Sequence, residues 1–369
     1  MYISDRPEWP LFRWDEVALL SPLAALRYRQ GRLLGRMEAL GFSLREEAIL
    51  ETLTQDAVKT SEIEGESLAR DQVRSSLARR LGIETAGLVP SSRQAEGITT
   101  VVLDATQRYT EPLTRERLFA WHEALFPDRD VGRHPITVGV WRTDALGPMR
   151  VVSGAGHRER IHFEAPPADR VDAEMTRFLD WLEDRNDPTD QVLKAAIAHI
   201  WFVTIHPFDD GNGRIVRALA DMLLARAEGT GRRFYSMSAR LRTERNAYYE
   251  TLEATQKGDL DITPRLAWFL RVLDGAIGDA ETTLDAVLRK ERFWRSLDSH
   301  PVNPRQTMML KRLLDGFQGK LTTSKWAQIA KCSHDTALRD IDDLIARGLL
   351  ARGEAGGRST SYQLIEPRL

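Results

Sequence analysis

The sequence predicts an all-α protein with only small β elements, and three observations support this fold class. The segment from Trp14 to Leu81 is typical of helices. The segment from Gln191 to Ile205 is apolar and Ala-rich, with no Gly or Pro. The segment after residue 214 carries the i, i+3, i+4, i+7, i+8 stripe of an amphipathic helix, formed by Ile215, Ala218, Leu219, Met222 and Leu223.

These patterns divide the chain into three regions. Residues 1–90 are predicted to form an N-terminal helical domain, and its aromatic run, Trp9–Trp14, is expected to pack onto the rest of the protein. Residues 91–290 are predicted to form a largely helical core. Residues 300–369 are predicted to form a separate, smaller domain.

The composition indicates a soluble cytoplasmic protein. The chain has 369 residues, of which 29% are charged, and its formal net charge of −2 points to neither a nucleic-acid nor an acidic partner. Its single cysteine, Cys332, excludes an internal disulfide and a cysteine-cluster metal site. Charged residues among the first ten argue against a signal peptide, and no apolar run approaches the ~18 residues of a membrane span.

The loop His206–Arg214, with sequence HPFDDGNGR, is the most informative stretch. It lies between two predicted helices, and Pro207 would disrupt a continuing helix. His206 can take up a proton near neutral pH without a large pKa shift, which suits a general base. Asp210 offers a hard oxygen ligand, and Mg²⁺ usually accepts one or two protein carboxylates together with substrate phosphates.

The rest of this loop is suited to binding anions. A glycine-bearing loop before a helix N-terminus favours phosphate, because unpaired N–H groups and the helix dipole point toward it. Gly211, Asn212 and Gly213 can therefore aim backbone N–H groups at developing negative charge. Arg214 and Arg217 lie three residues apart, away from the apolar stripe, where they can clamp outer phosphates. This set predicts attack by a hydroxyl on a metal-bound nucleotide.

Residues 206–217 resemble the signature HPFx(D/E)GNGRxxR of the Fic (filamentation induced by cAMP) family, and the match is complete. Fic proteins are typically AMP-transferases that act on Ser, Thr or Tyr hydroxyls. The resemblance implies that His206 deprotonates the target hydroxyl and that Asp210 holds Mg²⁺. The residues that it implies for the anion hole and for the clamp on the β- and γ-phosphates are Asn212, Gly213, Arg214 and Arg217. Doc-type toxins, which transfer phosphate, carry Lys in place of Gly213, so this glycine favours AMP transfer.

A second motif, Thr60–Gly65, resembles the Fic inhibitory motif (S/T)xxxE(G/N). Glu64 falls at the C-terminal end of a predicted helix, where the helix dipole disfavours a carboxylate. Such a carboxylate is better placed beside a cation, and the resemblance implies that this cation is Arg217. Glu64 would then occupy the position that the γ-phosphate needs, and the enzyme would be inhibited in cis. A solvated acidic helix end is the alternative.

Two further segments are assigned with the help of the resemblance. Thr137–Arg142 and Met149–Val152 are predicted to be strands around a turn at residues 146–148, and the family places a β-hairpin flap over the ATP site in this region. An edge of this flap could hold a target segment by strand addition. Asn246 and Tyr249 are predicted to contact the adenine, with a place in the core as the alternative for the tyrosine.

The C-terminal region has the pattern of a winged helix. Residues 323–330 and 333–346 are predicted helices, with Ser333 as N-cap of the second, and residues 353–358 would form a glycine-rich wing. From residue 301 onward, 11 Lys and Arg stand against 7 Asp and Glu. DNA binding needs several phosphate contacts, and three aspartates on the second helix oppose it. DNA binding, protein interaction and packing against the core all stay open.

We therefore expect a protein adenylyltransferase that uses ATP and Mg²⁺, is autoinhibited in cis by Glu64, and acts on a protein substrate or on itself. The same Glu could align a water to remove AMP from a modified protein. The alternative is a transcription regulator in which a nucleotide-sensing Fic core controls a DNA-binding winged helix. The sequence does not identify the target or decide between a monomer and a homodimer.

Overall fold

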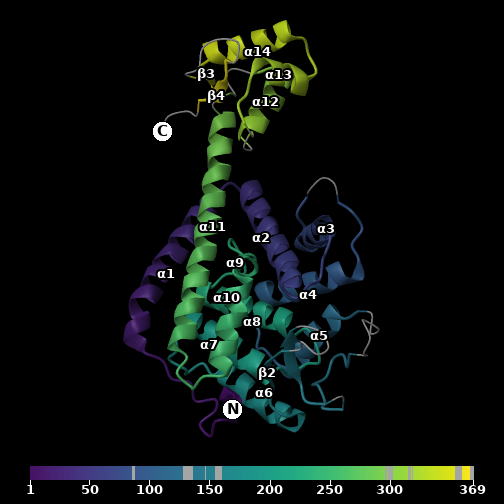
Figure 1. The fold of residues 1–369 in the computed structure, drawn as a ribbon, viewed down its shortest axis with the longest axis vertical. Helices are drawn as coiled ribbons and strands as arrows, with labels where there is room; N and C mark the ends of the chain where they lie inside the picture. Colours follow the sequence, from purple (N-terminus) through teal and green to yellow (C-terminus); the bar gives the residue numbers. More distant parts are fainter. Residues whose placement is uncertain are drawn as a thin grey trace. The chain divides into compact units, whose positions relative to one another are not determined.

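The computed structural model describes residues 1–84, 88–127, 136–145, 147–153, 160–295, 297, 302–314, 317, 319–353 and 360–365. The described chain is mostly helical, with two small antiparallel sheets of two strands each (Figure 1), so the predicted all-α class is confirmed. The chain forms two compact units, residues 1–280 and 281–369. The predicted division into three regions stays a prediction.

The first unit contains the elements from η1 to most of α11. In chain order they are η1 (Ile3–Asp5), α1 (Glu16–Glu38), α2 (Phe42–Ile63), α3 (Arg70–Leu81), α4 (Arg93–Gln107), α5 (Arg115–Leu125), β1 (Arg150–Ser153), β2 (Arg160–Glu164), α6 (Ala168–Glu183), α7 (Gln191–Ile205), α8 (Asn212–Glu228), α9 (Met237–Thr243), α10 (Arg245–Gln256) and α11 (Thr263–Arg295). The last residues of α11 belong to the second unit.

Helices α7 and α8 pack against each other at the centre of the first unit. Every residue of α7 from Val192 to Ile205 is buried, as expected for a helix that is apolar all round. Asp190 caps its N-terminus, because the carboxylate accepts a hydrogen bond from the backbone N–H of Val192 at 2.8 Å. This buried pair of helices gives the loop between them a rigid support.

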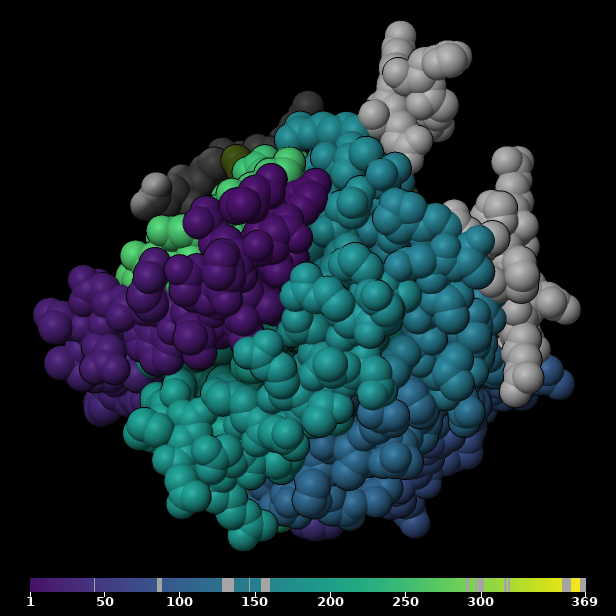
Figure 2. Space-filling model, turned by 90° about the horizontal axis from the view of Figure 1, so that it is seen from below, coloured from purple at the N-terminus to yellow at the C-terminus, as the bar shows by residue number. Residues whose placement is uncertain are grey.

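The N-terminal aromatic run packs onto the core as predicted. The rings of Trp9 and Phe12 lie edge-on to Trp201 of α7, with centroids 6.3 and 5.8 Å away. The indole N–H of Trp9 donates to Glu174 of α6 at 3.0 Å. Figure 2 shows the N-terminal segment, in purple, lying against the teal part of the chain.

A β-hairpin is present in this region, but its pairing differs from the predicted one. Strand β1 pairs with β2, so that Arg150 lies opposite Glu164, and residues 137–142 form no strand. Their alternation is typical of a strand, yet Gly139 has a φ of 75°. The backbone N–H groups of Thr137, Gly139 and Arg142 donate instead to Asp209, His122 and Pro207. Of the predicted turn, Leu146 lies outside the described residues.

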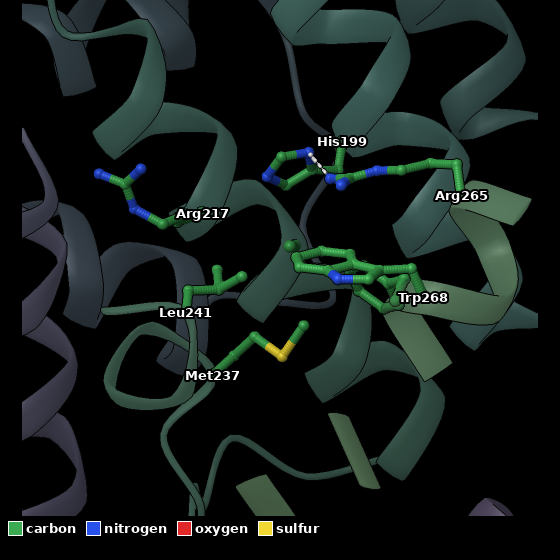
Figure 3. A pocket seen from close by; sticks show the side chains of 8 residues that line it. His199, Arg217, Met237, Leu241, Arg265 and Trp268 are labelled. Atoms are coloured by element: carbon green, nitrogen blue, oxygen red, sulfur yellow. Dashed lines mark hydrogen bonds between the residues drawn. The ribbon is translucent and has the colours of Figure 1, made fainter. Parts of the chain in front are cut away.

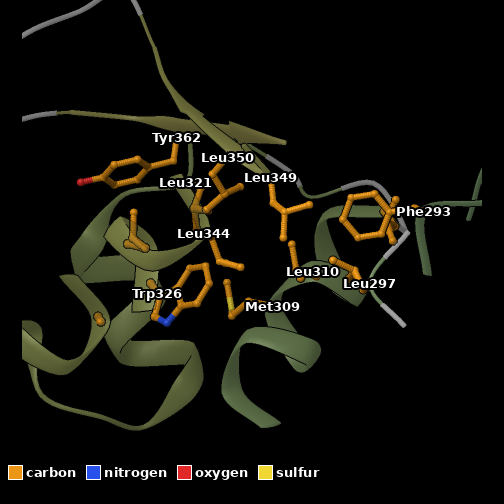
Figure 4. Packing of buried hydrophobic residues seen from close by; sticks show 13 residues of the cluster. Phe293, Leu297, Met309, Leu310, Leu321, Trp326, Leu344, Leu349, Leu350 and Tyr362 are labelled. Carbon is orange, nitrogen blue, oxygen red and sulfur yellow. The ribbon is translucent and has the colours of Figure 1, made fainter. Parts of the chain in front are cut away.

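The second unit has its own hydrophobic core. Its elements are α12 (Pro304–Leu314), α13 (Thr323–Ala330), α14 (His334–Ala346), β3 (Leu350–Arg352) and β4 (Tyr362–Leu364). Trp326 lies at the centre of a buried cluster with Met309, Leu344 and Tyr362 (Figure 4). Ser333 caps α14 through the N–H of Thr336, as predicted. Residues 354–358 of the predicted wing lie outside the described residues.

No helix within the described part of the chain is long and apolar enough to cross a membrane.

Candidate functional site

The loop between α7 and α8 takes a backbone path that its residues make possible. His206 ends α7 with a φ of 53°, which is unusual for a residue other than glycine. Gly211 begins α8 with a φ of 80°, and a Cβ atom there would lie 2.9 Å from the ring of Phe126. The loop is therefore held in one conformation, with a strained histidine at its start.

The surroundings of His206 fit a general base. Its Nδ1 lies 3.2 Å from the carbonyl of Val203, so Nδ1 donates and the neutral ring keeps Nε2 as a proton acceptor. Burial lowers the pKa of His206, the positive charge of Arg142 lowers it further, and Glu64 and Asp210 oppose this. A neutral imidazole at physiological pH is the form that can take a proton.

Arg142 fixes the position of this histidine, and sequence reasoning missed it. Its side chain is fully buried, and its Nε donates to the carbonyl of His206 at 2.8 Å. It also donates to the carbonyls of Pro166 and Ile205, and its backbone N–H donates to Pro207 at 2.9 Å. The guanidinium thus satisfies carbonyls at the C-terminal end of α7, which a helix leaves unpaired.

Asn212 and His122 hold the loop from within. The side-chain oxygen of Asn212 accepts from the backbone N–H of Phe208 at 3.0 Å, and its amide donates to the Phe208 carbonyl at 2.7 Å. Both polar atoms of the Asn212 side chain are therefore engaged, and its backbone N–H is the group that points out of the helix N-terminus. His122 stacks on the Phe208 ring at 4.2 Å and donates to the carbonyl of Asp210 at 3.2 Å.

The two arginines of the loop are both paired with carboxylates from the end of α2. Arg217 contacts Glu64 at 2.7 Å, and it also donates to the side chain and the carbonyl of Thr60 at 2.6 and 2.8 Å. Arg214 contacts Glu66 at 2.6 Å. The predicted contact between Glu64 and Arg217 is present, whereas sequence reasoning missed the role of Glu66.

Gly213 leaves the space that Glu64 fills. A Cβ atom on Gly213 would lie 2.0 Å from Oε1 of Glu64 and 3.1 Å from a guanidinium nitrogen of Arg217. Any larger residue at this position would push the carboxylate away from its arginine. Because Gly213 has no side chain, the Glu64 carboxylate at the end of α2 can approach α8 closely enough to pair with Arg217.

Several of these residues line one cavity of about 590 Å³, a size typical of small-molecule sites, while the side chains of Arg214 and Arg217 lie outside its lining. Its floor is formed by loop residues and Glu64, and its other sides by the hairpin β1–β2 and by α10. The predicted residues that line it are Glu64, His206, Asp210, Asn212, Gly213 and Tyr249. The structure therefore brings together segments that are far apart in the sequence.

Helix α10 presents Tyr249 to this cavity but not Asn246. Asn246 is exposed and does not line the cavity, so its predicted adenine contact has no support from the structure. Arg245 lies one turn before Tyr249 and stacks on its ring at 5.0 Å. The Arg245 side chain also donates to the carbonyl of Ile63 at 3.0 Å, so it anchors the end of α2 as well.

The hairpin is tied to α10 by one carboxylate. Glu253 accepts from His162 at 2.6 Å and from Arg160 at 2.9 Å, both on β2, and Lys257 lies at 2.6 Å. Hydrogen bonds from Lys257 and His162 lower the pKa of Glu253 to about 2, so it stays ionised. The Nε2 of His162 in turn contacts Ser153 of β1 at 2.6 Å. Both strands are thus fixed over the cavity.

A small buried cavity lies behind Arg217, lined also by His199, Arg265 and Trp268 (Figure 3). Arg265 donates to Nδ1 of His199 at 3.2 Å, and Nε2 of His199 faces the hydroxyl of Tyr248 at 3.3 Å. Burial and the charge of Arg265 lower the pKa of His199. His199 is therefore a neutral core residue, which agrees with its position on the fully buried α7.

The donor set suits Mg²⁺ only together with a substrate. Within the described residues no group of three or more His, Cys, Asp or Glu is placed to hold a metal ion. Asp210 brings one carboxylate to the cavity, and its Oδ1 accepts from the N–H of Gly211 at 2.6 Å. A single carboxylate fits a Mg²⁺ ion that takes its other ligands from phosphates and water.

Comparisons with known proteins agree with this geometry. A sequence model described as the Fic/DOC family matches residues 112–224. The chain carries a Fic/DOC family domain. A second model, described only as a domain of unknown function (DUF4172), matches residues 2–83. The Fic domain therefore holds the loop and α8, whereas Glu64 and Glu66 come from the segment before it.

The Fic domain has relatives among enzymes and solved structures. The chain is 28% identical over 202 residues to protein adenylyltransferase fic-1 of Caenorhabditis elegans, covering 54% of this chain and 36% of the relative. It is 26% identical over 251 residues to protein adenylyltransferase Fic of Nematostella vectensis, covering 65% and 50%. It thus spans between a third and a half of these relatives. A crystal structure of a Fic family protein from Desulfovibrio desulfuricans G20 shares the fold at a TM-score of 0.50 and 22% identity, covering 94% of this chain and 97% of that one.

Proposed function

We propose that this protein transfers AMP from ATP to a hydroxyl group of a protein, inhibited in cis by Glu64. The observation that carries the proposal is the convergence of a neutral His206, Asp210 and the N-terminus of α8 on one cavity of nucleotide size. The adenylyltransferases among the relatives support the same class of reaction.

The chemistry follows from the positions of the groups. The hydroxyl oxygen of a Ser, Thr or Tyr attacks the α-phosphorus of ATP, and Nε2 of His206 takes its proton. The bond from the α-phosphorus to the bridging oxygen breaks, and pyrophosphate leaves. The N–H groups at the start of α8 stabilise the charge on the α-phosphate. Asp210 would hold Mg²⁺, which supplies charge neutralisation for the phosphates.

The pairing of Glu64 supports the proposed inhibition. Its carboxylate pairs with Arg217, a side chain that is 2% exposed, and an arginine held in this way would not be free for a γ-phosphate. ATP would bind with its α-phosphate out of line until the end of α2 moves. The same carboxylate lies in the cavity, where it could orient a water for removal of AMP from a modified protein.

Two isotopic labels test the function. ATP labelled on the α-phosphate should transfer its label to protein in a host lysate, and ATP labelled on the γ-phosphate should not. The Glu64→Gly variant is the sensitive form for this assay. Label transferred from the γ-phosphate would make the protein a kinase and would contradict the argument from Gly213.

A DNA-binding regulator is the second candidate, and contacts within the second unit weaken one objection to it. The aspartates of α14 that would repel phosphate are paired: Asp340 with Arg305 at 2.8 Å, Asp342 with Arg352 at 3.1 Å and Asp343 with Arg347 at 3.0 Å. Arg339 is exposed on the same helix. The full chain should then bind DNA with an affinity that falls steeply with salt, and Arg339→Glu should weaken it. No binding at low salt would contradict this candidate.

A further inference from the structure

Glu66 makes a contact that the proposed function does not use. Its Oε2 lies 2.6 Å from Nη1 of Arg214, whose side chain is 4% exposed. The guanidinium also lies over the ring of Phe126, 4.9 Å from its centroid, and its Nε has no hydrogen-bond partner within the described residues. Glu66 is therefore the carboxylate that compensates a buried positive charge.

The turn after α2 explains how one short segment reaches two arginines. The N–H of Glu66 donates to the carbonyl of Ser61 at 3.0 Å, the N–H of Gly65 donates to that of Glu62 at 3.2 Å, and Gly65 has a φ of 87°. These are the bonds of a Schellman motif, which reverses the chain directly after a helix. Glu64 and Glu66 then stand on either side of the glycine, opposite two arginines that lie one turn apart on α8.

The charges around Glu66 would allow a phosphate to replace this carboxylate at Arg214. Burial raises the pKa of Glu66, the negative charges of Asp210 and Glu64 raise it further, and Arg214 opposes this. Three carboxylates thus lie close together, and the two loop arginines hold two of them in place. A phosphate carries more negative charge than a carboxylate and can take the same guanidinium in a forked geometry.

We propose that Glu66 is a second inhibitory carboxylate, which holds Arg214 as Glu64 holds Arg217. The inference rests on the proposed function, together with the expectation from the Fic resemblance that these two arginines hold the β- and γ-phosphates. A nucleotide must then displace two carboxylates, one for each outer phosphate. Because the proposed function assigns Arg217 to the γ-phosphate, Arg214 is left for the β-phosphate, so Glu64 opposes the γ-phosphate and Glu66 the β-phosphate.

Because each carboxylate opposes a different phosphate, the variants should respond differently to AMP, ADP and ATP. ADP has a β-phosphate but no γ-phosphate, so Glu66→Ala should raise its affinity about threefold to tenfold, because a part-exposed ion pair is lost. Glu64→Gly should change ADP affinity by less than about twofold. ATP should gain from both changes, and the double variant should gain close to the product of the two. AMP should gain from neither.

The experiment is calorimetric titration of AMP, ADP and ATP into the full chain with Mg²⁺, on a His206→Ala background that prevents turnover. Glu62→Ala is the matched control, because Glu62 lies in the same segment and pairs with Lys59 at 2.9 Å rather than with a loop arginine. Glu66→Gln keeps the volume of the side chain and replaces Glu66→Ala should the latter fail to fold, as judged by thermal unfolding.

The outcomes separate this inference from the function on which it rests. A gain in ADP affinity for Glu66→Ala and none for Glu62→Ala supports the second carboxylate. The inference is overturned if changing Glu66 leaves the ADP and ATP affinities within twofold of the parent and ATP gains affinity from Glu64→Gly alone. That result leaves the proposed function intact. If ADP and ATP bind no more tightly than AMP in every variant, the arginines hold no phosphate, and both fail.

Discussion

Two sides of the cavity differ in how they are held. The end of α2, Thr60–Glu66, contributes carboxylates to arginines that are 2% and 4% exposed. The hairpin β1–β2 instead exposes Val152 and Ile161 to solvent and is tied to α10 through Glu253. The arginines at the α2 end are thus almost fully buried, whereas the hairpin is tied down through the side chains Arg160 and His162, of which Arg160 is 69% exposed.

This difference indicates a division of tasks. In the proposed function the α2 end opposes the outer phosphates, so we expect its charges to affect how nucleotide binds. The hairpin lies on another side of the same cavity, and within the described residues β1 pairs only with β2. An unpaired strand edge is suited to pairing with an extended segment of a target protein. We therefore expect changes at α2 to act on nucleotide and changes at the hairpin to act on the target.

The largest expected effect comes from the base, which belongs to neither side. His206→Ala should lower AMP transfer by at least about a hundredfold, the usual range for a general base. Nucleotide affinity should stay nearly unchanged, because the arginines and the N-terminus of α8 remain. Transfer rate and ATP affinity, measured on the Glu64→Gly background, check this. An alanine variant that keeps most of its transfer rate contradicts the assignment.

A smaller effect is expected at the hairpin. Glu253→Gln weakens the contacts to Arg160 and His162, so the apparent KM for a protein target should rise about threefold to tenfold while kcat changes little. Glu250→Gln, on the exposed side of the same helix, is the control. A lower kcat with an unchanged KM would mean that Glu253 does not act by positioning the hairpin.

A third prediction concerns the pH dependence of stability and does not involve activity. Burial lowers the pKa of His122 from 6.5 to about 4, although hydrogen bonding to the Asp210 carbonyl opposes this. As the pH falls, the unfolded chain takes up this proton first, so stability should decline between pH 6.5 and about 4 and this contribution should then level off. The decline should reach about 3 kcal/mol, and His122→Gln should remove it. Chemical denaturation at several pH values measures both; an unchanged slope in the variant contradicts the assignment.

The sequence was sufficient for the parts of the site that are contiguous. The segment His206–Gly211 links α7 to α8, with Arg214 and Arg217 on the first turns of α8, and Glu64 lies directly after α2 beside Arg217. Both depend on local patterns: a proline and two glycines between apolar helices, and a glycine directly after a helical carboxylate. The predicted roles of these residues stay predictions.

Contacts between distant segments could not be predicted in this way. Arg142 reaches His206 across 64 residues, and Glu66 reaches Arg214 across 148. Nothing in their neighbours distinguishes them from solvated charges. The strand predicted at residues 137–142 failed for a related reason, because its N–H groups bond to the loop instead of to a neighbouring strand. Tertiary partners overrode a local pattern there.

Glu64→Gly tests the central claim most directly. Removing the carboxylate frees Arg217, so AMP transfer to lysate proteins and to the protein itself should rise about tenfold to a hundredfold, the equivalent of losing a charge-assisted contact of roughly 1.5–3 kcal/mol. Arg217→Ala should not reproduce this gain, because it removes the phosphate contact as well. The claim is contradicted if the variant transfers label from α-labelled ATP no faster than the protein that keeps Glu64, both to lysate proteins and to itself. Glu64 would then not inhibit the enzyme.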